Sequence, residues 1–134
     1  MAPRFLLDTH VVIRWLAEPA KLSRGQLRLL EEAVRRAEPV ALSAITLLEI
    51  ALLTSDGSAR IKGTIEDLFN ELQGNPAFRV LPLTFEIASE VASLGGSLRD
   101  PADRTIVATA RVHRLKLMTS DQRIIESRLV PVLE

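Results

Sequence analysis

The chain contains no cysteine and no tyrosine, and only one tryptophan, in 134 residues. Without cysteine it can form neither disulfides nor cysteine-based zinc sites, and it has no thiol nucleophile. Its stability must therefore come from a hydrophobic core, and a chain of this length can bury roughly two-thirds of its unfolded surface. Because 47% of the residues are hydrophobic, we expect one folded domain that spans residues 1–134. The lack of cysteine also agrees with the cytoplasmic location that we expect.

The sequence also lacks an excess of charge of either sign, with 17 basic and 17 acidic residues. Any binding to nucleic acid must therefore depend on a local basic patch. Long apolar segments are missing as well, since polar residues interrupt the most apolar stretch, residues 40–53, and a spanning helix needs about 20 apolar residues. The apolar segment before Asp8 consists only of Phe5, Leu6 and Leu7, fewer than the roughly 7 apolar residues that a signal peptide requires. We expect neither a signal peptide nor association with a membrane.

Short apolar segments alternate with segments of helical periodicity along the whole chain. The segments that we interpret as strands are residues 4–7, 40–42, 79–83, 116–119 and 130–133. Helices are expected at residues 11–16, 22–37, 44–54, 61–72 and 85–94, from Pro101 onward, and after Asp121. This alternation predicts the α/β class, as a three-layer sandwich with a four- or five-stranded, mainly parallel sheet.

Four acidic residues far apart in the sequence are directed to one edge of this sheet. Asp8 directly follows the first strand, and Asp121 follows the strand that ends at Thr119. Glu49 and Asp103 lie in the first two turns of helices that begin at the same edge, because a crossover helix runs antiparallel to its strands. Ligands of open parallel sheets bind at the carboxyl ends of the strands. We therefore expect these four carboxylates to form a site.

Each aspartate also has a purely structural explanation. Asp8 and Asp121 could simply cap the helices that follow them. Asp100, followed by Pro101, is expected to be a helix N-cap and nothing more. Asp103 would gain from the helix dipole and from a capping box with Asp100. None of these aspartates indicates a site when it is taken alone.

Glu49 is harder to explain, because its helical neighbours Ile45, Leu52 and Leu53 predict an apolar face. An unpaired buried carboxylate costs on the order of several kcal/mol, so it requires a cation or a proton. A distant arginine is one candidate, and a metal ion is the partner that we favour. Carboxylate oxygens select hard cations, which predicts Mg²⁺ or Mn²⁺, ions that serve phosphate chemistry. Mutual repulsion should raise the pKa of at least one acid, and Glu49 is the residue where we expect it most.

Four motifs occur in the order and at the spacing of one known family. They are residues 6–10 (LLDTH), 43–51 (SAITLLEIA), 100–104 (DPADR), which lead into the helix at 106–110, and 119–121 (TSD). The sequence resembles the PIN-domain ribonucleases, and closely the VapC-type toxins of bacterial toxin–antitoxin pairs. The resemblance covers nearly the whole chain and implies a single PIN-like nuclease domain.

The resemblance also implies specific roles. Asp8, Glu49, Asp103 and Asp121 correspond to the catalytic acids that bind Mg²⁺ or Mn²⁺, and Thr119 corresponds to a hydroxyl that orients them. The family implies cleavage of single-stranded RNA, either tRNA or mRNA, a homodimer and a small antitoxin partner. Related proteins often carry a bulkier residue at the position of Ala102, so the mouth of this site should differ from theirs.

The remaining candidates are basic residues near the acids. Arg99, Arg104 and Arg123 are candidates for contact with RNA phosphates, although a solvated surface position is the default for each. His10 could touch the substrate, but we expect an exposed histidine at the start of a helix. Two other functions stay open. A phosphotransfer receiver would need an aspartate where Thr84 stands, and a non-catalytic interaction module would not need the complete set of acids.

Overall fold

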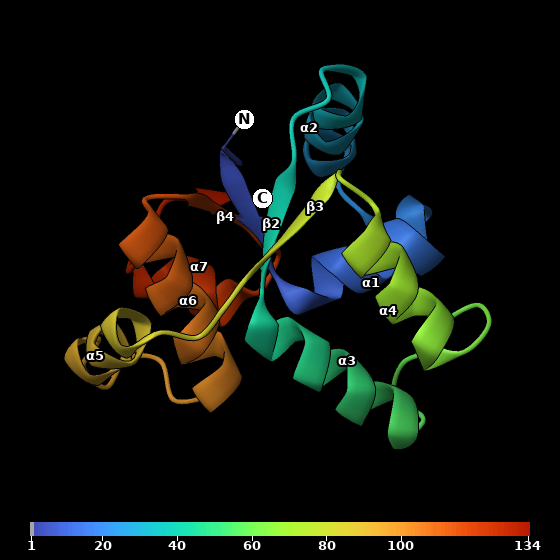
Figure 1. Ribbon diagram of the computed structural model, residues 1–134. Helices are drawn as coiled ribbons and strands as arrows, with labels where there is room; N and C mark the ends of the chain where they lie inside the picture. Colours follow the sequence, from blue (N-terminus) through green and yellow to red (C-terminus); the bar gives the residue numbers. More distant parts are fainter. Residues whose placement is uncertain (1) are drawn as a thin grey trace.

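The computed structural model describes residues 2–134, and in this part of the chain five strands form one sheet with helices on both faces (Figure 1). In chain order the strands are β1 (Phe5–Leu7), β2 (Val40–Ser43), β3 (Phe78–Leu81), β4 (Lys116–Met118) and β5 (Val132–Leu133). The helices are α1 (Thr9–Ala17), a 3-10 turn at Pro19–Lys21, α2 (Arg24–Arg35), α3 (Ala44–Ser55), α4 (Ile65–Gly74), α5 (Phe85–Ser93), α6 (Pro101–His113) and α7 (Gln122–Ser127). All pairings are parallel, in the order β3-β2-β1-β4-β5. The predicted α/β class and parallel sheet are confirmed.

The helices begin where polar cap residues stand. The side chains of Ser43, Thr84 and Asp100 each accept a hydrogen bond from a backbone N–H in the first turn of the helix that follows. The predicted helix at residues 61–72 begins later, because Thr64 forms a capping box with Asp67. The 3-10 turn and the short extent of β5 were not predicted.

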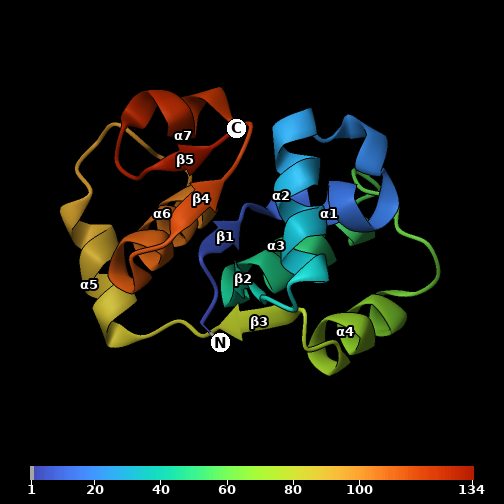
Figure 2. The ribbon, with the colours of Figure 1, turned by 90° about the horizontal axis from the view of Figure 1, so that it is seen from above.

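The sheet separates two hydrophobic clusters. Side chains alternate along a strand, so Leu6 faces α5, α6 and α7, whereas Phe5 and Leu7 face α1, α2 and α4. Figure 2 shows these two groups of helices on opposite sides of the strands. The three-layer arrangement predicted from the sequence is therefore confirmed.

The topology brings several helix starts to one edge of the sheet. β1 lies in the centre of the sheet, between β2 and β4. In Figure 1, α1 and α3 begin from the lower ends of β1 and β2, which are the carboxyl ends of these strands. None of the helices between residues 2 and 134 has the length and hydropathy needed to cross a membrane.

Candidate active site

Asp8 stands at the end of the central strand, and its carboxylate is almost fully buried. One oxygen, Oδ1, accepts a hydrogen bond from the N–H of Thr9 at 2.8 Å, so Asp8 does cap α1. The other oxygen, Oδ2, accepts from the hydroxyl of Thr119 at 2.7 Å and lies 3.2 Å from Nδ1 of His10. In the described chain no lysine or arginine pairs with this carboxylate. Capping alone therefore leaves a buried, oriented carboxylate without a permanent counter-cation.

His10 connects two turns that are far apart in the sequence. Its Nε2 accepts a hydrogen bond from the backbone N–H of Ser120 at 3.1 Å, and its Nδ1 lies 3.2 Å from Oδ2 of Asp8. Because Nε2 accepts a hydrogen bond, the ring proton is assigned to Nδ1, the nitrogen that faces Asp8. We expected an exposed histidine here, but only 30% of the side chain is exposed. Its position two residues after Asp8 was the only sequence signal that could have indicated this role.

Thr119 joins two of the predicted acids. Its buried hydroxyl donates to Asp8 and accepts from the backbone N–H of Asp121 at 3.0 Å. The hydroxyl of the next residue, Ser120, accepts a hydrogen bond from the side-chain amide of Gln26 in α2. Gln26 is fully buried. The turn between β4 and α7 is thus held by side chains from both α1 and α2. Sequence analysis did not single out Gln26.

Glu49 lies in the second turn of α3 and reaches Thr9. The Thr9 hydroxyl donates to Glu49 at 2.5 Å and lies 3.0 Å from the buried hydroxyl of Thr46. The predicted apolar surroundings are partly wrong: Ile45 packs against the core, whereas Leu52 is 57% exposed. The apolar residues of α3 are distributed around the whole helix, so they do not show which of its faces is buried. The prediction that Glu49 is near the other acids nevertheless holds, and in the described residues no arginine pairs with it.

Burial raises the pKa of Glu49 above its ordinary value. The hydrogen bond from Thr9 opposes this shift, and the nearby carboxylates of Asp8 and Asp100 add to it. The expectation of a raised pKa at Glu49 is therefore confirmed in direction, and both burial and mutual repulsion contribute to it.

The large shift belongs to Asp103. Burial, followed by the negative charges of Asp100, Asp8 and Asp121, raises the pKa of Asp103 to about 7. Asp100 caps α6 as predicted, accepting from the Asp103 N–H at 2.9 Å. The reverse bond of a capping box is not among the hydrogen bonds of residues 2–134. Asp103 is therefore held by its backbone, while its carboxyl faces like charges.

Arg123 lies across the mouth of this acidic cluster. Its guanidinium is 3.1 Å from Oδ2 of Asp121 and 3.8 Å from Oδ2 of Asp103, and 74% of the side chain is exposed. Burial of Asp121 raises its pKa, but the hydrogen bonds and charge of Arg123 outweigh this and leave the pKa below its ordinary value. Asp121 also caps α7, as its structural explanation required. In this structure Arg123 is the counter-cation of the acids.

The prediction that Arg104 contacts RNA phosphate finds no support in the structure. Its guanidinium donates to three backbone carbonyls, those of Gly95 and Leu98 at 2.6 Å and that of Val91 at 2.7 Å. These bonds tie the end of α5 and the loop after it to α6, so we assign Arg104 a structural role. Arg99 is exposed and, with Asp103 and Arg123, lines a hollow of about 240 Å³ beside the acids.

The site has the donors of a hard divalent cation, although they are not yet gathered around one point. Within residues 2–134 no three histidine, aspartate or glutamate side chains converge closely enough to hold a metal ion. The acids are nevertheless close enough to shift one another's pKa values. Carboxylate oxygens are the ligands that Mg²⁺ and Mn²⁺ prefer. The residues therefore fit such an ion by their chemistry, provided that the side chains close around it.

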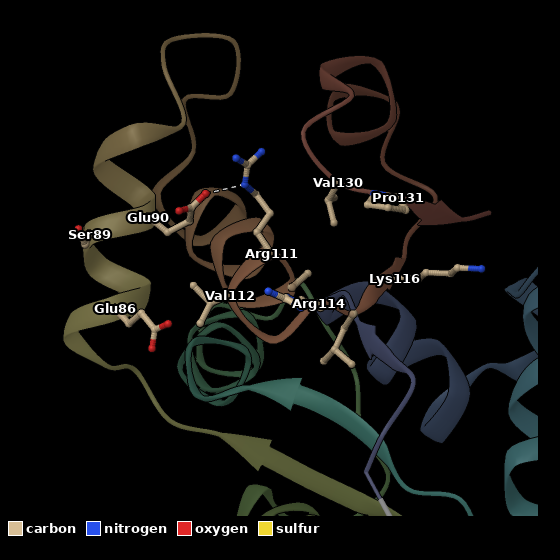
Figure 3. A pocket seen from close by; sticks show the side chains of 11 residues that line it. Glu86, Ser89, Glu90, Arg111, Val112, Arg114, Lys116, Val130 and Pro131 are labelled. Atoms are coloured by element: carbon tan, nitrogen blue, oxygen red, sulfur yellow. Dashed lines mark hydrogen bonds and ion pairs between the residues drawn. The ribbon is translucent and has the colours of Figure 1, made fainter.

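A larger hollow, of about 870 Å³, lies at the opposite edge of the sheet, near the end of α6 and the start of β4 (Figure 3). Figure 3 shows Arg111 turned toward Glu90, and their side chains are 2.6 Å apart. Arg114 and Lys116 also line this hollow, and none of the four predicted acids does. Its size alone does not make it the candidate active site.

Three comparisons with known proteins agree with one another. The family model described as "PIN domain" matches residues 5–128. Ribonuclease VapC22 of Mycobacterium tuberculosis (strain ATCC 25618 / H37Rv) is 32% identical over 120 residues, which cover 89% of this chain and 88% of that protein. The crystal structure of FitAcB from Neisseria gonorrhoeae superposes with a TM-score of 0.70 at 28% identity, covering 97% and 96% of the two chains. A toxin–antitoxin complex from Klebsiella pneumoniae gives 0.63 at 22% identity, covering 97% and 96%, and supports the fold alone.

Proposed function

Because the chain belongs to the PIN-domain family and is related to the VapC ribonuclease toxins, we propose that it is a metal-dependent endoribonuclease, the toxin of a toxin–antitoxin pair. The proposed nuclease is a single domain over residues 1–134. The observation that carries the proposal is the meeting of acids from four separate segments at the carboxyl edge of the sheet. Burial and like charges raise the pKa of Asp103 to about 7 there. A folded chain that keeps such repulsion has a place for a cation.

In this proposal Asp8, Glu49, Asp103 and Asp121 would hold Mg²⁺ or Mn²⁺. When bound, such an ion neutralises the scissile phosphate and lowers the pKa of an attacking water. The residues around the acids prepare them for this task. Thr119 and His10 fix one oxygen of Asp8, and Thr9 fixes Glu49. These contacts orient Asp8 and Glu49, and the other carboxylates would have to move toward them to surround a cation.

Arg123 changes partners in this scheme. Without a metal ion it neutralises Asp121 and approaches Asp103. A divalent cation would replace it as the counter-charge, and the exposed guanidinium would then be free to bind an RNA phosphate. Arg99, on the wall of the same hollow, is the second phosphate contact that we propose on this side of the acids.

The proposed protein partners are a cognate antitoxin and a second copy of the chain. The antitoxin should place an arginine among the acids, since a bidentate guanidinium can replace a metal ion as counter-charge, in the manner of Arg123 here. For the homodimer, exposed apolar side chains on α3 and before and within α5 are the candidate contacts, namely Leu48, Leu52, Leu83 and Phe85. The proposed location is the cytoplasm, and the proposed substrate is tRNA or mRNA.

The deciding experiment measures cleavage of single-stranded RNA by the purified chain with Mg²⁺ or Mn²⁺ and with EDTA. We expect cleavage with either metal and none in EDTA. Asp8→Asn, purified in parallel, should cleave at least about a hundredfold more slowly, since even groups that only orient metal ligands contribute about 10- to 100-fold. Asp100→Asn should stay close to wild type, because asparagine also caps helices. Metal-dependent cleavage by Asp8→Asn at the wild-type rate would refute the assignment and point to a contaminating nuclease.

A further inference from the structure

A hollow lies next to the acidic cluster, separated from Asp8 by His10. His10 lines this hollow, whose volume is about 380 Å³. Its walls come from α1, from the C-terminal half of α3 and from residues 57–60. The hollow therefore begins at a residue that touches Asp8 and runs along the surface of α1.

The charged residues of this hollow leave an excess of positive charge. Lys21 and Glu18 neutralise each other, with 2.9 Å between Nζ and Oε2. The other two cations are Arg14 and Arg60. Neither guanidinium makes an ion pair or a side-chain hydrogen bond with any residue between 2 and 134. Two arginines without a partner among the described residues thus line a hollow that reaches His10, the neighbour of Asp8.

The spacing along α1 connects this charge to the site. Arg14 follows His10 by four residues, so the two side chains lie on the same helix face, about 6 Å apart along the axis. His10 in turn contacts Asp8. A polyanion whose phosphate reaches the acids would therefore place its next phosphates within reach of Arg14.

A second hollow flanks the acids from the other side. It is the hollow of about 240 Å³ lined by Arg99, Asp103 and Arg123. In both ribbon views α1 lies on one side of β1, whereas α6 and α7 lie on the other (Figures 1 and 2). Asp8, at the end of β1, is thus between two hollows that each contain arginines. The second hollow also contains Asp100 and Asp103, so its arginines lie among the acids, whereas no acid of the cluster lines the hollow of Arg14 and Arg60. A linear strand that crosses the cluster would therefore meet an excess of positive charge on the side of α1.

We propose that the hollow lined by Arg14 and Arg60 binds the phosphate backbone of single-stranded RNA beside the acidic cluster, as the counterpart of the Arg99 and Arg123 side. The inference rests on the proposed function and adds the path along which the bound RNA strand extends from the acids. A chain with zero net charge needs a local basic patch to bind RNA, and these arginines supply one. The residues that line the hollow include no phenylalanine, tyrosine or tryptophan, and the ring of His10 is held by Asp8 and Ser120, so phosphates rather than stacked bases are the groups that it would recognise.

The test measures RNA binding apart from cleavage. The parent protein is Asp103→Asn, which removes one repelling acid and suppresses turnover. The probe is a fluorescein-labelled oligouridine of about ten nucleotides, a length within single-strand site sizes, and its anisotropy is followed over a range of salt concentrations. Arg14→Ala and Arg60→Ala should each weaken binding about fivefold. Each should also reduce the salt slope by about 0.7, the value for one lost phosphate contact. Arg35→Ala, an exposed arginine at the end of α2, is the matched control and should bind as the parent does.

Several outcomes decide the proposal. It is overturned if the Arg14→Ala, Arg60→Ala double variant binds with the parent's affinity and salt slope, or if the parent itself does not bind the probe. It is also overturned if the double variant loses binding of an oligoglutamate peptide but not of the RNA, because the hollow would then be a protein site. In the otherwise wild-type chain, the double variant should raise KM with kcat unchanged. A wild-type chain that binds the probe but never cleaves RNA would refute the proposed function and leave the binding site standing.

Discussion

At the edge of the sheet where the strands begin, acidic side chains are paired with arginines. Arg4, just before β1, lies 2.7 Å from Glu38, just before β2, and Arg111 lies 2.6 Å from Glu90. At the edge where the strands end, Asp8 has no arginine or lysine partner in the described chain, and the nearest one to Asp103 is 3.8 Å away. At the first edge arginines neutralise the acids. At the second edge Asp8 and Asp103 keep a negative charge that is available to bind a cation. Of the four acids, Asp121 alone has a close arginine partner within the described residues, Arg123 at 3.1 Å. The comparison teaches that incompletely paired acids, rather than acids as such, distinguish the candidate site.

The largest expected difference between the two edges is in activity. Glu49→Gln should reduce RNA cleavage by at least about a hundredfold, because it removes a charge that would hold the metal ion. Glu90→Gln, at the paired edge, should leave kcat/KM within about twofold of wild type. Both rates are measured under single-turnover conditions with Mn²⁺. Equal losses in the two variants would remove the functional distinction between the edges.

His10 tests whether the turn at the carboxyl edge must be held in place. His10→Ala removes the bond to Asp8 and the acceptor for the Ser120 N–H, so it should weaken Mn²⁺ binding and cleavage by about 10- to 100-fold. The other histidine, His113, is exposed at the end of α6, and His113→Ala should change neither. Calorimetric titration with Mn²⁺ and cleavage assays give the two readouts. If Mn²⁺ affinity is unchanged in His10→Ala, the contact with Asp8 has no role in the site.

Arg104 shows that a paired arginine can also lie near the acids. Replacing it with alanine removes its bonds to three carbonyls. We expect a loss of about 2–3 kcal/mol in the free energy of unfolding. Each hydrogen bond to a charged group contributes about 1.5–3 kcal/mol, and the partial exposure of the Arg104 side chain reduces the sum over its three bonds. Urea denaturation measures this loss. Unchanged stability together with a raised KM for RNA would restore the phosphate-contact prediction.

The smallest effect concerns stability without metal, and its sign depends on pH. The pKa of Asp103 is about 7 in the folded chain and 3.8 as the ordinary value. A raised folded pKa adds stability that is complete below the ordinary pKa and is lost as the pH rises to about 7. In EDTA at pH 8, Asp103→Asn should therefore melt a few degrees higher than wild type, about 2–4 °C per kcal/mol for a chain of this size.

The control for that melt is the same pair of proteins at pH 4, where wild-type Asp103 is largely protonated and the difference should vanish. Mn²⁺ should raise the melting temperature of wild type at pH 8 and raise that of Asp103→Asn less, because it binds the folded acidic cluster. A variant that melts lower than wild type at pH 8 in EDTA would mean that Asp103 stabilises the start of α6, and that its charge is not under strain.

Local signals explain why much of the site was predictable. Asp8 follows an apolar strand and Asp100 precedes a proline, and both patterns depend only on neighbouring residues. The reasoning about Glu49 reached the right neighbours for a partly wrong reason. The pattern of apolar residues does not show which face of a helix is buried when apolar residues occur on all of its faces. Leu52, which was expected on the buried face with Glu49, is exposed. The predicted rise in the pKa of Glu49 is confirmed in direction, but the larger rise, at Asp103, was not predicted, since it depends on how deeply Asp103 is buried and on which carboxylates face it.

The sequence by itself determined the α/β class, the starts of most helices and the edge at which the four acids gather. The physical reason is that chain direction, caps and alternation are properties of short segments. Only the tertiary structure decided how the cations near the site are used. Arg104 is bound to backbone carbonyls while Arg123 pairs with the acids, although the two look equivalent in the sequence. It also decided that His10 holds Ser120, 110 residues away. Such contacts depend on how distant turns pack against each other, and no local pattern records that.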